Sequence, residues 1–564
     1  MKLPPMTRLE KKVFELYCEL NPSDAYAMGL REYAGKVMIL SSENLSNAIN
    51  RINELRKLCG PKDTLVRKFL DSIEVSMEFE EPGVGVAQVT QAISVHLIKE
   101  GLKAAHLEPL TRSLAESLDA WLRFLEGREY TVAVKILAQY QALGALEVIN
   151  MLEREAKEPA LLESVGKLRK KVDEFRSAYQ VPGFTLGEFE EVEKIMLDKG
   201  ADLGREKFYP RALKFGFDYA ESWKELERRA LNWLDQDLPK FLVATRKLSK
   251  RLNCDDEPEA VYARLKARPG VSGKQALDTT KRIRKIIQPL IAESIVGINP
   301  GYRVSVVETP PYLAPILPTA AAQGFDSLTT KPYQFYYLTI DPKRAPPEGF
   351  ADLVNTLVHE EYGHCVHFSN SATAYAARPT ITEILSSPNS GTSAEGLAFQ
   401  RELEFLNLLY RIRKKKPSAR TIAERKFLLM LEEFGGFEQF LEELEFATYR
   451  FRVVRFLRVI GDTRINSGKQ NLIEFLRWAE RKTGLSRRTV FYQLFPAHEG
   501  IFPGYATCYA VVGQDIRSVQ RTIQNNPKKL VKFNAYASSM GYPPRSIYIN
   551  RLRTFARKLA GRKR

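Results

Sequence analysis

The spacing of hydrophobic positions predicts helices over most of the first half of the chain. From about residue 9 to residue 298, apolar residues recur every three or four positions, which is the period of one face of a helix. Proline and glycine interrupt this pattern at short intervals, for example at residues 268–270, and mark turns. The clearest predicted helices cover residues 9–20, 132–158, 220–249 and 274–296.

The period of the pattern changes after residue 299. Residues 303–308 and 334–341 are rich in β-branched and aromatic side chains and are bounded by proline or glycine, so both are predicted strands. A helical pattern resumes near Gly349. Long helices are then predicted over residues 395–414, 423–433, 437–460 and 471–483. The expected fold class is therefore mainly α, with a small β-sheet beside one of the helices.

The length of 564 residues allows more than one domain. We expect a helical scaffold domain over residues 1–298 and a second region over residues 299–564. No run approaches 18 consecutive apolar residues and the N-terminus lacks a secretory pattern, so no membrane span is expected. The five cysteines include no Cys-x-x-Cys pair, which favours reduced thiols and a cytoplasmic protein.

The net charge of +17 leaves several kinds of partner open. Nucleic acid, an anionic membrane surface and acidic substrates would all be attracted to such a chain. The densest basic run, residues 551–564, has Leu552, Phe555 and Leu559 at helical spacing, which predicts a basic amphipathic helix. No recognition motif for nucleic acid accompanies it, so nucleic acid is not the favoured partner.

The segment over residues 357–364, LVHEEYGH, nearly matches the His-Glu-x-x-His signature of zinc hydrolases. In that signature two imidazoles one helical turn apart bind the metal and the glutamate activates a water. Here His359 and His364 are five residues apart, which is about 140° around an ideal α-helix. Either the match is accidental, or the helix is locally rewound at Gly363, or another residue is the ligand.

The residues alone leave the ligand set open. Glu383 and Glu395 both follow at distances typical of a third zinc ligand. Within the segment itself, Glu360 and His364 have the standard four-residue ligand spacing, with Glu361 as the base. That alternative leaves His359 without a role.

Four blocks in order give a more specific indication. The histidine segment is followed by residues 395–402 (EGLAFQRE) and 503–513 (PGYATCYAVVG), and preceded by the turn 309–313 (TPPYL). Together they resemble the domain-of-unknown-function 885 family, predicted zinc peptidases related to helical thermolysin-like and oligopeptidase-like enzymes. That family also separates its two histidines by more than four residues and places a glycine before the second. The resemblance covers about residues 300–525.

The resemblance implies a role for each matched residue. His359, His364 and Glu395 would bind one zinc ion, and Glu360 would be the general base that takes a proton from the attacking water. Of the residues that follow, Tyr509 and His498 would donate hydrogen bonds to the developing oxyanion. Another divalent metal would also suit such nitrogen and oxygen ligands.

The expected protein is thus a cytoplasmic zinc metallopeptidase of the carboxypeptidase or oligopeptidase type, acting on a peptide substrate. The strand over residues 334–341 is expected to offer its edge to an extended peptide. The alternative is a catalytically inactive, basic helical protein that binds an anionic partner such as nucleic acid.

Overall fold

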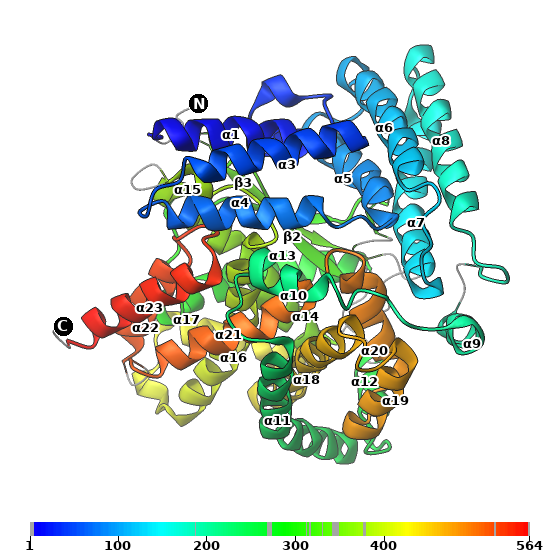
Figure 1. The fold of residues 1–564 in the computed structure, drawn as a ribbon. Coiled ribbons are helices and arrows are strands. Elements are labelled where there is room, and N and C mark those ends of the chain that lie inside the picture. Colours follow the sequence, from blue (N-terminus) through cyan, green and yellow to red (C-terminus); the bar gives the residue numbers. More distant parts are fainter. Residues whose placement is uncertain are drawn as a thin grey trace.

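Helices make up most of the chain, and one small sheet lies among them (Figure 1). This confirms the predicted mainly α fold. The structure is a computed structural model. It describes residues 5–185, 188–267, 273–311, 313–314, 317, 319–329, 331–340, 349–375, 380–523 and 526–561. The predicted turn at residues 268–270 and the predicted strand end at residue 341 lie outside these residues.

The N-terminal half is helical throughout its described part, as its hydrophobic period predicts. In Figure 1 its blue and cyan helices α1 to α8 occupy the upper part of the view. These elements are α1 (Arg8–Leu20), α2 (Pro22–Ala27), η1 (Arg31–Tyr33), α3 (Ser42–Lys57), α4 (Thr64–Met77), α5 (Gly83–Glu100), α6 (Ala104–Phe124), α7 (Val132–Glu155), α8 (Pro159–Ala178), α9 (Phe189–Lys199), α10 (Tyr209–Arg211), η2 (Ala212–Gly216), α11 (Trp223–Leu252), α12 (Pro258–Lys266) and α13 (Lys274–Ser294).

After the first strand, β1 (Val304–Glu308), the chain forms two more strands and a second set of helices. They are β2 (Ala320–Phe325), β3 (Tyr333–Leu338), α14 (Phe350–Leu357), η3 (Val358–Cys365), α15 (Val366–Tyr375), η4 (Ile381–Glu383), α16 (Ser390–Lys414), η5 (Pro417–Ala419), α17 (Ile422–Leu431), η6 (Glu432–Phe434), α18 (Phe437–Asn466), α19 (Leu472–Thr483), α20 (Arg487–Leu494), η7 (Phe495–Glu499), η8 (Tyr505–Thr507), α21 (Cys508–Gln520), α22 (Pro527–Ala537) and α23 (Arg545–Leu559).

The sheet has the strand order β1-β3-β2. β3 pairs in parallel with β1 and antiparallel with β2, so both of its edges are hydrogen-bonded. The expectation that this strand offers its edge to a peptide is therefore wrong, and the outer positions belong to β1 and β2. The sequence did not predict β2, because its AAAQGF run lacks the β-branched residues that mark a strand.

The hydrophobic core runs across the predicted boundary at residue 298. One cluster of buried side chains joins Leu226 and Ile283 of the first half to Leu403 and Phe456 of the second. Another cluster, centred on α1 to α8, also takes in Leu385. Shared packing therefore ties the two regions together. The division into two domains stays a prediction.

Helix α7 is long and apolar enough to span a membrane by length and composition. Within the fold, however, 67% of its most apolar window is buried. Its buried face includes Ile136, Ala142 and Ile149. This is the pattern of a core helix, which also has to be apolar on most of its surface.

The basic C-terminal helix packs against the rest of the molecule. Leu552 of α23 is fully buried, as the amphipathic pattern predicts. Arg545 forms ion pairs with Glu221, and Arg551 forms one with Glu383. Part of the positive charge of this helix is therefore used in intramolecular contacts.

Candidate metal centre

The two histidines of the sequence motif lie on one turn of a π-helix. The chain leaves the sheet through β3, continues through α14 and widens into η3, which contains both His359 and His364. Hydrogen bonds in a π-helix join residues five apart, so side chains at that spacing lie one above the other. The two imidazole rings are 5.0 Å apart and nearly perpendicular. The wider helix therefore accommodates the extra residue of the motif.

Gly363 has a steric role in this turn. A Cβ atom at this position would lie 2.5 Å from both the Cα and the Cβ of Ala398 on α16. Real side chains are essentially never that close, so only glycine allows η3 and α16 to approach in this way. The rewinding expected at Gly363 does occur in η3, and the glycine serves the contact between two helices.

Glu395 on α16 brings the third ligand to the histidines. Its Oε2 atom lies 3.3 Å from Nε2 of His364 and 3.8 Å from Nε2 of His359. Tetrahedral zinc with bonds of about 2.0–2.1 Å places its ligand atoms roughly 3.4 Å apart. The same Oε2 is buried and makes no hydrogen bond within the described part of the chain. The three side chains therefore fit a divalent metal ion.

The charges of the three groups are mutually dependent. Burial alone would raise the pKa of Glu395, but the two imidazoles outweigh it and hold that pKa well below its usual range. Burial likewise opposes protonation of His364, yet Glu395 and Glu360 together raise the pKa of this histidine. The carboxylate thus stays ionised. Because a buried charge is costly unless it is paired, a metal ion bound here would stabilise it.

A buried carboxylate fixes the orientation of His359. Nδ1 of His359 lies 2.7 Å from Oε1 of Glu402, and Arg455 donates to both oxygens of that carboxylate at 2.8 Å. With Nδ1 directed at the carboxylate, Nε2 is left to face Glu395. Supporting carboxylates of this kind orient metal-binding histidines and make them more basic.

Sequence reasoning gave Glu402 no role, although a signal was present. Glu402 closes the block that begins with Glu395, and residues seven apart lie on the same face of a helix. One helix therefore carries both a ligand and the support for another ligand.

The two glutamates after His359 point to different surroundings. Glu361 is fully buried and accepts hydrogen bonds from Nε and Nη2 of Arg284 and from the hydroxyl of Tyr302. Glu360 is half-buried, and its charge is felt by His364. The alternative in which Glu361 is the base is not favoured, because this carboxylate is already held by an arginine.

The other glutamate candidate and a nearby histidine lie outside the group. Glu383 forms an ion pair of 2.8 Å with Arg551, and it is not among the residues whose ligand atoms converge on the histidines. His367 directs Nδ1 at the carbonyl oxygen of Ser538, 3.1 Å away, and burial lowers its pKa to about 3. His367 is therefore a neutral core histidine that ties α15 to the chain after α22.

Aromatic side chains from the 503–513 block line the other side of the group. The hydroxyl of Tyr505 donates to Oε1 of Glu395 at 2.6 Å, a contact that sequence reasoning did not anticipate. Tyr509 lies nearly parallel to the ring of His359, with centroids 6.3 Å apart. Its hydroxyl is 3.3 Å from Nε2 of His498, so the two predicted oxyanion donors contact each other.

Nearby arginines set the charge around these donors. Burial, followed by the guanidinium of Arg458, lowers the pKa of His498 well below its usual value, so this histidine is neutral. Arg458 itself is half-buried, and loss of solvation lowers its pKa to about 10; its guanidinium lies 5.0 Å from the centre of the Tyr509 ring. Tyr509 and His498 thus lie beside a positively charged guanidinium group.

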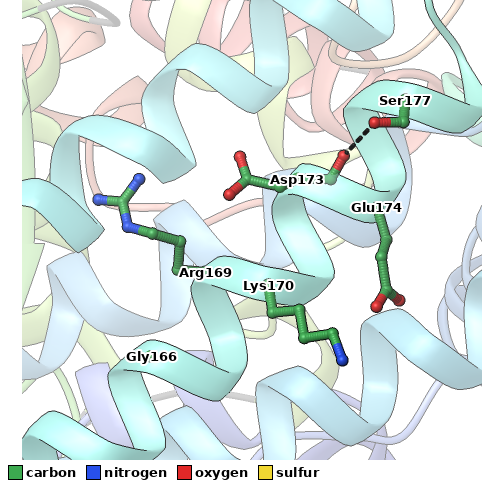
Figure 2. A pocket seen from close by; sticks show the side chains of 6 residues that line it. All are labelled: Gly166, Arg169, Lys170, Asp173, Glu174 and Ser177. Carbon is green, nitrogen blue, oxygen red and sulfur yellow. Dashed lines mark hydrogen bonds between the residues drawn. The ribbon is translucent and has the colours of Figure 1, made fainter.

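A hollow elsewhere on the surface offers no comparable chemistry. It lies along the outside of α8 and is lined by residues of that one helix, including Arg169, Lys170 and Asp173 (Figure 2). Arg169 is already paired with Glu153. The side chains point in different directions and do not converge on a common point.

Comparison with known proteins supports the fold. No family model matches the chain, and no curated protein matches its sequence. A solved candidate lipoprotein of unknown function from Shewanella oneidensis is 16% identical with a TM-score of 0.64, covering 97% of this chain and 98% of its own. A candidate lipoprotein from Colwellia psychrerythraea is 13% identical with a TM-score of 0.63, covering 98% and 99%. At these identities the likeness shows the fold alone.

A lower similarity extends to a candidate oligoendopeptidase F from Bacillus anthracis. Its identity is 13% and its TM-score 0.34, over 97% of this chain and 95% of that one. A TM-score this low carries no argument about function. The mainly α fold with a buried group of two histidines and one glutamate defines the class of this protein: a helical protein with a candidate metal site.

Proposed function

We propose that this protein is a metal-dependent peptidase whose site is formed by His359, His364 and Glu395. One observation carries the proposal: a single π-helical turn directs both imidazoles at the same unpartnered oxygen of Glu395. Zinc is the metal that such a ligand set suits best, at one ion per site. The four sequence blocks that resemble the 885 family support peptide hydrolysis over other reactions.

The residues around the site have separate tasks in this proposal. A bound metal ion supplies Lewis acidity, which makes water nucleophilic at neutral pH. Glu360, half-buried beside His359, accepts the proton of the attacking water and passes it to the leaving amine. Glu402 and Arg455 keep His359 in the tautomer that frees Nε2.

Tyr509 and His498 serve the oxygen of the scissile carbonyl. Their mutual contact of 3.3 Å is long for a hydrogen bond of a hydroxyl group, so either can turn toward a substrate oxygen. Because His498 is neutral, it donates as an imidazole and keeps its proton. Tyr505 holds Glu395 through its other oxygen and leaves Oε2 for the metal.

The peptide itself has a place beside the metal helix in this proposal. β2 is an outer strand of the sheet and packs against η3. Gly324 on this strand faces the ring of Phe368, one helical turn after His364. An extended peptide pairing with the outer side of β2 would run past the histidines.

The decisive experiment combines metal analysis with peptide hydrolysis. The purified chain is expected to retain zinc and to cleave short peptides. Glu360→Gln should keep the metal but lose activity by about 10²–10⁴-fold, the usual contribution of a general base. Glu361→Gln is the matched control, and it should retain most activity because Glu361 contacts Arg284.

Three results would count against the proposal. A chain that binds no metal at saturating zinc has no such site. Activity lost in Glu361→Gln and kept in Glu360→Gln would mean that Glu361, and not Glu360, is the base. Retention of nucleic acid that falls steeply with salt, without hydrolysis, would instead favour the inactive basic binder.

The compartment belongs to the same proposal. The five unpaired cysteines favour the cytoplasm. The two candidate lipoproteins of the same fold point toward an anchored location outside it. Cell fractionation followed by detection of the full chain decides between them.

A further inference from the structure

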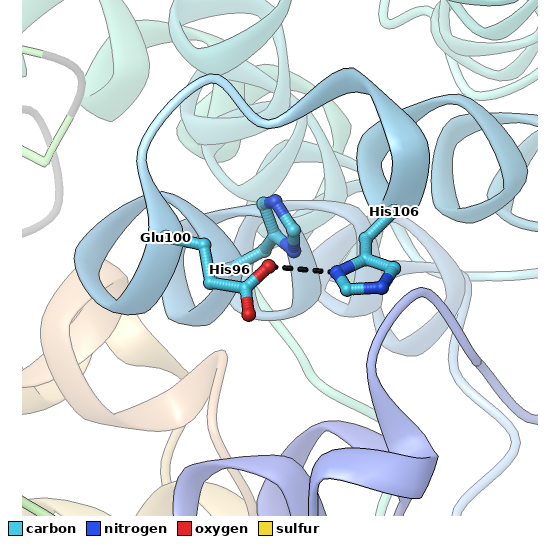
Figure 3. A group of neighbouring side chains, drawn as sticks. All are labelled: His96, Glu100 and His106. Atoms are coloured by element: carbon cyan, nitrogen blue, oxygen red, sulfur yellow. Dashed lines mark hydrogen bonds and ion pairs between the residues drawn. The ribbon is translucent and has the colours of Figure 1, made fainter.

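A second convergent group of ligand side chains lies among the N-terminal helices. His96 and Glu100 are four residues apart on α5, hence on one face of that helix. His106 stands in the first turn of α6, directly after the short connection between the two helices. Figure 3 shows the three side chains directed at one another, and one ligand atom from each lies within 4.8 Å of the others.

His96 is buried without a partner. The residue is 1% exposed, and neither ring nitrogen makes a hydrogen bond of normal geometry in the described part of the chain. A buried polar group left in this state destabilises the fold. The ring of Tyr26 stacks on it at 6.2 Å, which limits its rotation. Burial also lowers the pKa of His96 to about 4, so the imidazole is neutral and able to bind a metal at pH 7.

The other two residues give access from solvent. The side chain of Glu100 is 23% exposed and that of His106 is 34% exposed, and they contact each other at 2.7 Å. The ammonium group of Lys103 lies 3.4 Å from the same carboxylate. Its side chain is 54% exposed, so it can move away when another cation takes its place.

We propose that His96, Glu100 and His106 form a second metal site, which binds zinc or a divalent ion of similar ligand preference. Two imidazoles and a carboxylate favour such ions over calcium and magnesium, which prefer oxygen ligands. The site shares no residue with the group around Glu395 and does not depend on the proposed peptidase function.

A metal at this place would fasten the end of α5 to the start of α6. Lys99, the residue before Glu100, links this helix end to other parts of the fold. Lys99 donates to the carbonyl oxygen of Tyr26 at 2.8 Å and to Asp326, the residue after β2. A clamped helix end would therefore hold the N-terminal helices firmly against the end of an outer strand of the sheet.

The test uses the full chain, stripped with a chelator, reloaded with zinc alone and freed of excess by gel filtration. His364→Gln is the background, because it removes a ligand of the first site. This variant is expected to retain about one zinc per chain, and His364→Gln with His106→Gln to retain almost none. Zinc should raise the Tm of the His364→Gln variant and leave that of the double variant unchanged.

Further variants separate ligand loss from misfolding. Glu100→Gln should release the metal as His106→Gln does, whereas Glu108→Gln on the same helix as His106 should retain it. Far-UV circular dichroism of the metal-free variants checks that each is folded. Since His106 and Glu100 are partly exposed, neither substitution disturbs the core.

The outcomes for the two sites are distinguishable. No zinc in the His364→Gln background, or zinc that stays after both His106→Gln and Glu100→Gln, overturns the second site. Zinc that depends on His106 in the His364→Gln background, together with a natural chain that shows no peptidase activity, supports the second site and contradicts the proposed function.

Discussion

At the scale of single residues, the support of a ligand matters as much as the ligand. Glu402→Gln replaces the acceptor for Nδ1 of His359 by a neutral group that can present either end to it. We expect metal affinity to fall roughly 10–100-fold, the usual effect of losing such a partner. Competition with a chelator of known affinity measures this change.

A control of similar burial isolates the effect on the metal. Glu361→Gln also breaks a buried ion pair, here with Arg284. Both Glu361→Gln and Glu402→Gln should destabilise the fold, by at most about 5 kcal/mol. Only Glu402→Gln should weaken metal binding. An equal loss of affinity in both variants would mean that general destabilisation explains the result.

The sequence could indicate His359, His364 and Glu395 because their residue types and blocks are those of metal ligands, and the structure brings them together. It could not indicate the pairing of Tyr505 with Glu395. These residues are 110 positions apart, and Tyr505 lies in η8, directly before α21, which packs on α16. Nor could it show that His96 and His106 converge, since each is a lone histidine on a separate helix.

At the scale of elements, the approach of η3 to α16 holds the ligands together. Gly363→Ala would force a methyl group against Ala398, so the two helices must separate. We expect a loss of about 1–3 kcal/mol in the free energy of unfolding, with weaker metal binding because His364 moves away from Glu395. Chemical denaturation and metal titration measure the two effects.

Gly166→Ala is the matched control for that substitution. Gly166 lies inside α8, and a Cβ there would meet no atom within 4 Å. This variant should be more stable by about 0.5–1 kcal/mol, as is usual when alanine replaces glycine in a helix. If Gly363→Ala is also stabilised and still binds metal, the steric role of Gly363 is wrong.

Element type was predictable where the period of the sequence was long and regular, as in α1, α13 and α19. The π-helix was not, because hydrophobic spacing in η3 does not differ from that of an interrupted α-helix. The second outer strand was also missed. β2 is stabilised by pairing with β3 and has little strand preference of its own.

At the scale of the whole molecule, a buried pair of acids makes stability depend on pH. Glu499 and Asp462 are both buried, and Asn466 donates to both of their carboxyl groups. Burial, followed by the nearby charge of Asp462, raises the pKa of Glu499 to about 8. In the unfolded chain this pKa is about 4.3. The folded chain thus holds a proton that the unfolded chain releases.

Stability should therefore fall as pH rises from about 4 to 8, because the unfolded state binds fewer protons over this range. Glu499→Gln does not titrate, and its amide can occupy the side of the carboxyl group that has no hydrogen bond in the described residues. The stability of this variant relative to the natural chain should increase with pH. Denaturation at pH 5, 7 and 9 measures the difference, and a constant difference would contradict the assignment.

The mainly α architecture could be predicted from the hydrophobic period, whereas the arrangement of the core could not. Buried side chains such as Ile283 and Phe456 meet across the predicted boundary at residue 298. Their contact depends on the packing of distant helices. The charge of +17 was likewise visible in the sequence, but not that Arg545 and Arg551 are used in ion pairs.

Because Glu395 and Glu402 stand seven residues apart on α16, their separation is set by the rise of one continuous helix. An insertion or deletion between them would rotate one carboxylate away from the histidines while leaving the other in place. Length changes before Ser390, by contrast, can be taken up by the preceding loop. In related chains we therefore expect this stretch to keep a constant length even where its other residues vary.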